Sequence, residues 1–202
     1  MMLSGLKIKE EVEKGNIVIE NFDSSKKENG KSRLNPNSYN LTLNSKLLVY
    51  EEKILDMKKN NKTKELIIPE EGLVLEPGKL YLGQTSEFTS TDKYIPALSG
   101  RSSIGRLGIA IHITAGFGDV GFNGKWTLEI SCIQPVRIYP NTEICQIYYH
   151  TIEGEYELYS SEKYQNQEGV MASKMYKDFE WSIKLILFLI IAWQVYANTL
   201  II

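Results

Sequence analysis

The residues best suited to chemistry lie in a glycine- and arginine-rich segment in the second half of the chain. It runs from Gly100 to Arg106 and includes Arg101, Ser102 and Ser103. Guanidinium groups and hydroxyls bind phosphate oxygens, and glycines let backbone N–H groups approach an anion. The Gly-Lys-Ser/Thr ending of a Walker loop is missing. The segment predicts a site for a phosphorylated small molecule, with a tight loop carrying surface arginines as the alternative.

A carboxylate interrupts an apolar strand pattern shortly afterwards. Alternation puts apolar side chains on one face of the strand, at Leu128, Ile130 and Cys132. Glu129 falls on the other face, between Thr127 and Ser131. This placement favours a carboxylate that transfers protons, and the alternative is the exposed face of an antiparallel sheet.

The histidines and cysteines do not form a zinc pattern. His112 is interpreted as a hydrogen-bonded structural residue, with a ligand role as the alternative, and His150 is given no role. Cys132 and Cys145 each lie in an apolar run, which indicates buried free thiols. The His-x-Glu and Pro-Cys-x-x-Cys signature of zinc deaminases is absent. We therefore expect no zinc cofactor.

The length and the net charge of the chain limit the classes of protein to which it can belong. The chain has 202 residues, which suggests one domain with a sizeable core. Its net charge of −2 argues against binding to a nucleic-acid polymer, which usually requires a basic patch. The polar N-terminus lacks an apolar secretion segment, so we expect a cytoplasmic protein.

The order of elements predicts an all-β fold with one short helix. Ser4 is placed to cap a helix over residues 4–13. Many short strands separated by turn residues are typical of a β-sandwich or barrel. Residues 156–179 are polar and Tyr-rich, which indicates a mostly irregular arm. The predicted strands are Asn16–Glu20, Ser38–Leu43, Leu47–Glu51, Leu66–Pro69, Leu73–Leu75, Lys79–Gln84, Ile109–Thr114, Trp126–Ile133, Val136–Tyr139 and Glu143–His150.

The composition changes after Glu180. The residues from Leu185 to Ile202 include no charged side chain. The length of this uncharged run is at the lower edge of what a membrane-spanning helix needs. Three interpretations of this tail are open: a membrane anchor, a helix that docks on a partner, and a tail foreign to the domain. We therefore expect a domain over residues 1–180 and an apolar tail over 181–202.

Taken together, residues 3–180 resemble the dCTP deaminase family of the trimeric dUTPase-like superfamily. The most specific matches are Gly100–Gly108, the Thr114-Ala115-Gly116 turn leading to Asp119, Thr127-Leu128-Glu129 and Lys163–Gln167. The resemblance implies a distorted, jelly-roll-like β-barrel of the dUTPase (β-clip) type, with a short N-terminal helix and a C-terminal lid arm. It also implies a homotrimer with active sites at subunit interfaces. Ser99 departs from the family, which often has an acidic residue there.

The resemblance also implies a reaction, the hydrolytic deamination of dCTP without zinc, with Mg²⁺ bound through the nucleotide phosphates. Glu129 would be the general acid/base, and Ser102, Arg106 and the Ala115 carbonyl would position the attacking water. The implied substrate-binding residues are Arg101, Ser102, Ser103, Ile104, Gly105, Arg106, Asp119, Thr127, Leu128, Glu129, Tyr156, Lys163 and Gln167.

Members of the family differ in their product. Those with Thr-Ala-Gly before the aspartate resemble a bifunctional form that also cleaves dUTP to dUMP and diphosphate. Gly116-Phe117 follows Ala115 here, which favours dUMP formation, with Asp119 helping to activate a second water. The alternatives are a deaminase that releases dUTP, a dUTPase, or a nucleotide-binding regulator. Glu129 argues against the last two, because a dUTPase needs no deaminating carboxylate there.

Overall fold

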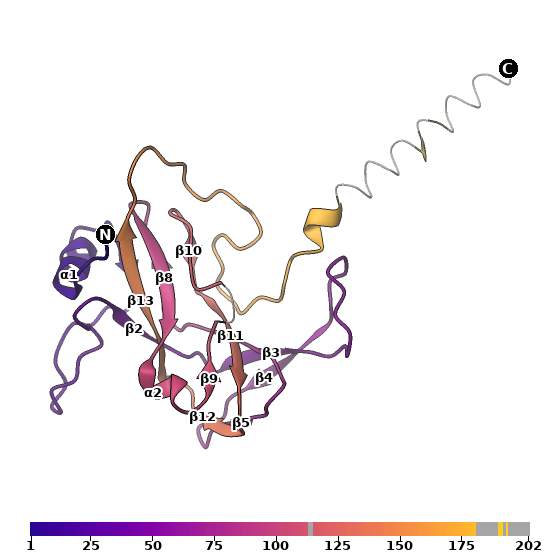
Figure 1. Cartoon of the computed structure of the whole chain (residues 1–202), viewed down its shortest axis with the longest axis horizontal. Helices are drawn as coiled ribbons and strands as arrows, with labels where there is room; N and C mark the ends of the chain where they lie inside the picture. The colour runs from indigo at the N-terminus through magenta and orange to yellow at the C-terminus, as the bar shows by residue number, and fades with distance from the viewer. Residues whose placement is uncertain (113–114, 181–189, 192, 194–202) are drawn as a thin grey trace. The chain divides into compact units, whose positions relative to one another are not determined.

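A computed structural model of the chain describes residues 1–112, 115–180, 190–191 and 193 (Figure 1). Most regular structure is β, which confirms the predicted fold class. The helices are α1 (Gly5–Glu13) and α2 (Ser102–Gly105). The strands are β1 (Val18–Ile19), β2 (Tyr39–Thr42), β3 (Lys46–Tyr50), β4 (Thr63–Ile67), β5 (Leu73–Leu75), β6 (Tyr81–Gln84), β7 (Thr89–Ser90), β8 (Tyr94–Gly100), β9 (Ile109–Ala110), β10 (Asn123–Gly124), β11 (Thr127–Cys132), β12 (Val136–Ile138) and β13 (Glu143–Thr151).

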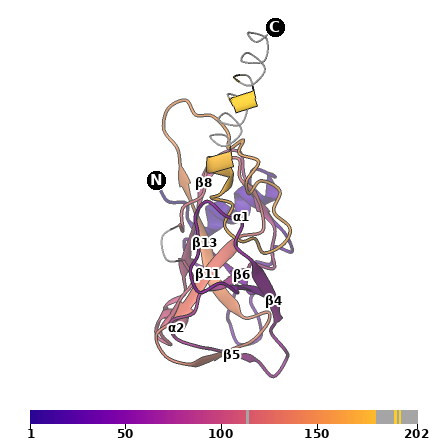
Figure 2. The same ribbon diagram turned by 90° about the vertical axis from the view of Figure 1, so that its right-hand side faces the viewer.

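The strands are distributed over four sheets. Their orders are β4-β3-β6-β11-β9, β2-β13-β8, β1-β7-β10 and β12-β5. All the strand pairings described between these strands are antiparallel. Figure 2 shows β11 and β6 side by side. Within the described part of the chain the sheets form a distorted β fold and do not close into one continuous barrel.

The chain forms two compact units. The first comprises residues 1–49 and 64–171 and holds every predicted site residue. The second comprises residues 50–63 and the described residues from Ala172 onward. In the second unit the Ser173 N–H donates to the Tyr50 hydroxyl at 3.0 Å, and Lys58 lies over the Phe179 ring.

Helix α1 begins where the sequence predicts. The Ser4 hydroxyl accepts from the Lys7 N–H at 3.2 Å, as an N-cap does. Gly15 follows the helix with φ +74°, a left-handed conformation that glycine adopts readily. Glu11 is buried on the inner side of the helix, where Lys7, Lys93 and Asn16 bind its carboxylate. The hydrogen bonds from Lys7 and Asn16 hold the pKa of Glu11 well below its usual range.

The alternation predicted for Thr127–Cys132 is confirmed. Leu128 and Ile130 are fully buried, and Cys132 is nearly so, whereas the residues between them are partly exposed. Both cysteines are free and buried, as predicted. Burial raises the pKa of the Cys132 thiol. These residues join one hydrophobic core with side chains from β2, β8 and β13.

The fold differs from the prediction in several elements. Strand β4 begins before the predicted Leu66–Pro69, and β7, β10 and the short helix α2 were not predicted. Strand β8 was missed because Pro96 lacks the N–H that a central strand needs. Among the named strands β8 pairs with β13 alone, so it lies at the end of its sheet, where proline is tolerated. The strand predicted over Ile109–Thr114 is described only as the two residues Ile109–Ala110, and Thr114 lies outside the described residues.

The interpretation of the tail depends mainly on residues 181–189, 192 and 194–202, which lie outside the described residues. Within the part of the chain that the structure describes, no helix is long and apolar enough to cross a membrane.

Candidate active site

The glycine–arginine segment forms the end of β8 and the single turn of α2. Ile104 points inward and is 9% exposed, which anchors the turn to the core. Ser102, Ser103 and Arg106 are exposed on the other side. The predicted loop is therefore a helical turn held by one apolar side chain, and its polar groups face outward.

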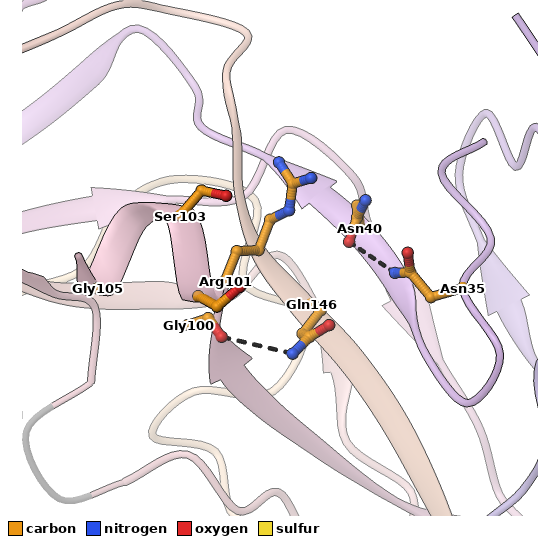
Figure 3. Close-up of a pocket in the computed structure, with 8 residues that line it drawn as sticks. Asn35, Asn40, Gly100, Arg101, Ser103, Gly105 and Gln146 are labelled. Carbon is orange, nitrogen blue, oxygen red and sulfur yellow. Dashed lines mark hydrogen bonds between the residues drawn. The ribbon is translucent and has the colours of Figure 1, made fainter. Parts of the chain in front are cut away.

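A pocket of about 470 Å³ lies beside this turn (Figure 3). Four of its lining residues were predicted to bind substrate: Arg101, Ser102, Ser103 and Gly105. Gly100 belongs to the same predicted segment. The sequence did not predict the remaining three lining residues, Asn35, Asn40 and Gln146. No local signal marks these three, because they come from two segments far from Arg101 in the sequence.

The three amide side chains belong to one hydrogen-bond network. Asn35 donates to the Asn40 side-chain oxygen at 2.8 Å, and the Ser38 hydroxyl donates to Gln146 at 3.0 Å. The Gln146 amide in turn points at the Gly100 carbonyl, at 3.4 Å (Figure 3). The network fixes neutral polar groups along one wall of the pocket.

Arg101 is oriented by an acidic neighbour. Its guanidinium donates to the Glu143 backbone carbonyl at 2.8 Å and lies 3.4 Å from the Glu143 carboxylate. Asn40 donates to the same carboxylate at 2.8 Å, and Lys27 lies 3.6 Å from it. Glu143 thus has three donors around it and holds Arg101 at the pocket wall.

Glu129 lies in the middle of β11, opposite Leu82 of β6. Its side chain is 30% exposed, and one carboxylate oxygen is 3.3 Å from His112 Nδ1. His112 is 9% exposed, and its Nε2 is buried with no hydrogen-bond partner within the described part of the chain. The hydrogen bond predicted for His112 is therefore one to the candidate base, so His112 is placed to orient the Glu129 carboxylate.

The C-terminal arm reaches the same face of β11 through Gln167. Gln167 is 3% exposed, and its amide donates to the Thr127 hydroxyl. Tyr156 is exposed and donates to the Asp92 carbonyl at 3.2 Å. The backbone N–H of Lys163 donates to the Ser161 hydroxyl. Of the three predicted arm residues, Gln167 is the one whose described contact lies beside Glu129 on the same strand.

The other predicted site residues differ in their exposure. Leu128 and Ile104 are buried in the core, so their side chains cannot reach a ligand and only their backbone could. Asp119 and Ala115 are exposed. Gly116 has a steric reason to be glycine, because a Cβ there would lie 2.7 Å from the Leu98 carbonyl oxygen.

The arginine–serine segment and Glu129, both predicted to belong to one site, do not line the same pocket within one copy of the chain. The described lining of the pocket includes the arginine–serine segment but neither Glu129 nor Asp119. Over the described ranges, no three His, Cys, Asp or Glu side chains gather as a metal site. The groups lining the pocket, amides, hydroxyls and a guanidinium, suit an anion such as a phosphate.

The chain was also compared with known proteins. A family model described as "dCTP deaminase-like" matches residues 2–152. The "dCTP deaminase, dUMP-forming" of Clostridium beijerinckii is 64% identical over 180 residues, covering 89% of this chain and 99% of that protein. The protein of the same name from Cytophaga hutchinsonii is 61% identical over the same shares of both chains.

Among solved structures, the 2'-deoxycytidine 5'-triphosphate deaminase of Agrobacterium tumefaciens is similar, with a TM-score of 0.56 and 20% identity. The match covers 74% of this chain and spans 48% of the length of that one, and it supports the fold. The family match covers the arginine–serine segment and Glu129, and the relatives extend it over the arm. The chain therefore belongs to the dCTP deaminase family, in its dUMP-forming branch.

Proposed function

We propose that this chain deaminates dCTP hydrolytically and carries the product on to dUMP and diphosphate. The observation that supports this best is the 64% identity, over nearly the whole length, to relatives named for that activity. The partly exposed Glu129, fixed on a buried strand beside His112, supplies the chemistry that the first step needs.

In the first step Glu129 acts as both base and acid. It takes a proton from water, and the resulting hydroxide forms a bond to C4 of the cytosine ring. The carboxyl group then delivers this proton to N3 of the ring. Glu129 next moves the proton of the new C4 hydroxyl to the exocyclic amine, the bond between C4 and that nitrogen breaks, and ammonia leaves as the C4 carbonyl forms. The products are dUTP and ammonia. General acid/base catalysis of this kind contributes roughly 10²–10⁴-fold in rate.

The arginine–serine segment binds the phosphates and helps to position the water. Ser102 of α2 and Arg106, which directly follows this helix, are exposed, so they can serve a site on another copy of the chain. The described lining of that pocket does not include Glu129. We therefore infer a homotrimer in which the segment of one copy completes the Glu129 site of another.

Mg²⁺ enters this scheme with the nucleotide. The pocket offers donors for phosphate oxygens, and Glu143, the carboxylate that holds Arg101 at its wall, is already bound by Arg101 and Asn40. Such a donor set fits the phosphates of a Mg²⁺–nucleotide better than a metal held by the protein. The ion would neutralise phosphate charge, while Arg101 and Ser103 orient the phosphates.

The second step breaks the bond between the α- and β-phosphates of dUTP. Asp119 is exposed and polarises the water that attacks the α-phosphorus, and diphosphate leaves. Arg106 stabilises the charge that develops on the phosphate. Tyr156 and Lys163 belong to the arm that closes over the triphosphate.

One experiment tests the proposal. The protein is incubated with dCTP and Mg²⁺, and nucleotides, ammonia and diphosphate are quantified over time. We expect ammonia and diphosphate in equal amounts, with little free dUTP. Release of dUTP without diphosphate would leave a deaminase alone. Cleavage of added dUTP without deamination of dCTP would indicate a dUTPase, and binding without turnover a regulator.

A further inference from the structure

Gln84 is a buried polar residue to which the proposed mechanism gives no role. It ends β6, where all four residues are buried, and it is itself 3% exposed. A polar side chain this deeply buried normally has a hydrogen-bond partner. The Gln84 amide donates to the backbone carbonyl of Glu168, at 2.5 Å. A residue of the sheet therefore holds a residue of the C-terminal arm.

The residue opposite Gln84 on the adjacent strand also binds the C-terminal arm. Thr127 of β11 is paired with Gln84 in the strand register. Its hydroxyl accepts from the Gln167 amide at 2.5 Å and from the Met171 backbone N–H at 3.2 Å. One cross-strand pair thus contacts the arm at three points, Gln167, Glu168 and Met171.

Backbone contacts seat the arm at the same place. Gly124 of β10 forms a parallel bridge with Gln167, and the Lys125 N–H donates to the Gln167 carbonyl at 2.7 Å. A Cβ at Gly124 would lie 2.9 Å from the Gln167 nitrogen. In Figure 1 the arm runs beside β10 and β11. The backbone sets the position of the segment, and Gln84 and Thr127 supply its side-chain anchors.

These anchors lie next to the candidate base. Thr127 and Glu129 are two residues apart on one strand, so their side chains point to the same face about 7 Å apart. The arm segment that Gln84 holds therefore borders the face on which Glu129 would meet the cytosine.

We propose that Gln84 is a positioning residue for the arm. Through the Glu168 carbonyl it keeps residues 167–171 seated beside Glu129, and this seating raises the affinity for dCTP. The proposal rests on the proposed function, in which the arm closes over the bound nucleotide. Gln84 does not touch the reacting atoms, and it acts through the arm alone.

The test compares Gln84→Leu with wild type in the full chain. Leucine keeps most of the volume and removes the donor. Loss of one hydrogen bond to the arm predicts a rise in KM for dCTP of about five-fold, with kcat within about two-fold. Hydrogen–deuterium exchange without nucleotide should be faster in peptides covering residues 165–171 and unchanged in β11.

A matched control is Glu168→Ala. Gln84 binds the backbone carbonyl of Glu168, and the side chain of Glu168 is exposed, so this variant keeps the anchor. We expect its KM and its exchange pattern to equal those of wild type.

Three outcomes would overturn the proposal: unchanged exchange in 165–171, a fall in kcat with unchanged KM, or loss of protection throughout the sheet. The exchange result is obtained without substrate. If wild type failed to turn over dCTP, the proposed function would fail while the exchange result still decided whether Gln84 anchors the arm.

Discussion

Replacing Glu129 by glutamine tests the proposed chemistry most directly. The flanking residues Leu128 and Ile130 are fully buried and do not change, and the amide has nearly the shape of the carboxylate. The 30% exposed side chain lies at the open side of the strand, so we expect little loss of stability. The contact to His112 at 3.3 Å can be kept by the amide oxygen. The variant therefore removes the basic group but keeps the packing of β11 and the contact to His112.

The size of the expected loss of turnover follows from the proposed role of Glu129 as general acid and base. Loss of general acid/base catalysis raises the barrier by about 3–5 kcal/mol, which lowers turnover by roughly 10²–10⁴-fold. Binding of dCTP should stay within about three-fold, because the amide keeps the volume of the carboxylate and one of its two acceptor oxygens. The assay measures ammonia release over time, and isothermal titration calorimetry measures the affinity of the variant.

The matched control is Glu65→Gln, a glutamate on β4 whose side chain is half exposed and pairs with Lys46. It should turn over dCTP at the wild-type rate. If Glu129→Gln kept more than about a tenth of wild-type turnover, Glu129 could not be the group that transfers the protons.

Four further predictions follow from the sequence and the structure. Asp119→Asn should lower diphosphate release more than ammonia release, and equal losses would separate Asp119 from the second step. Activity should survive a zinc-selective chelator and fall when Mg²⁺ is withheld; stoichiometric zinc, with activity lost on its removal, would contradict the zinc-free reaction. Light scattering should give three times the monomer mass for the full chain and for the chain shortened to residues 1–180, with equal turnover, whereas an active monomer would contradict the shared site. Finally, Lys7 and Asn16 hold the pKa of Glu11 below its usual 4.5, so this stabilisation is present above that pH and is lost as pH falls through the lowered value. The melting temperature should therefore drop on acidification below about pH 4.5, and less so in Glu11→Gln, where this carboxylate no longer titrates.

Local patterns in the sequence determined a large part of this protein. The Ser4 cap located α1, and alternation located the buried and open faces of β11, because each depends on residues a few positions apart. Residue types and their spacing predicted the arginine–serine segment and Glu129 as candidate site residues. The buried state of both cysteines followed from the apolar runs around them.

Tertiary structure decided which distant residues meet. Asn40 and Gln146 join Arg101 at one pocket because β13 pairs with β2 on one side and with β8 on the other. His112 reaches Glu129 because β9, which precedes it, pairs with β11. Gln84 meets the arm because the register places it opposite Thr127. Strand register between segments far apart in the chain sets all of these contacts, and no short-range pattern encodes it, because the same alternation is compatible with several partners.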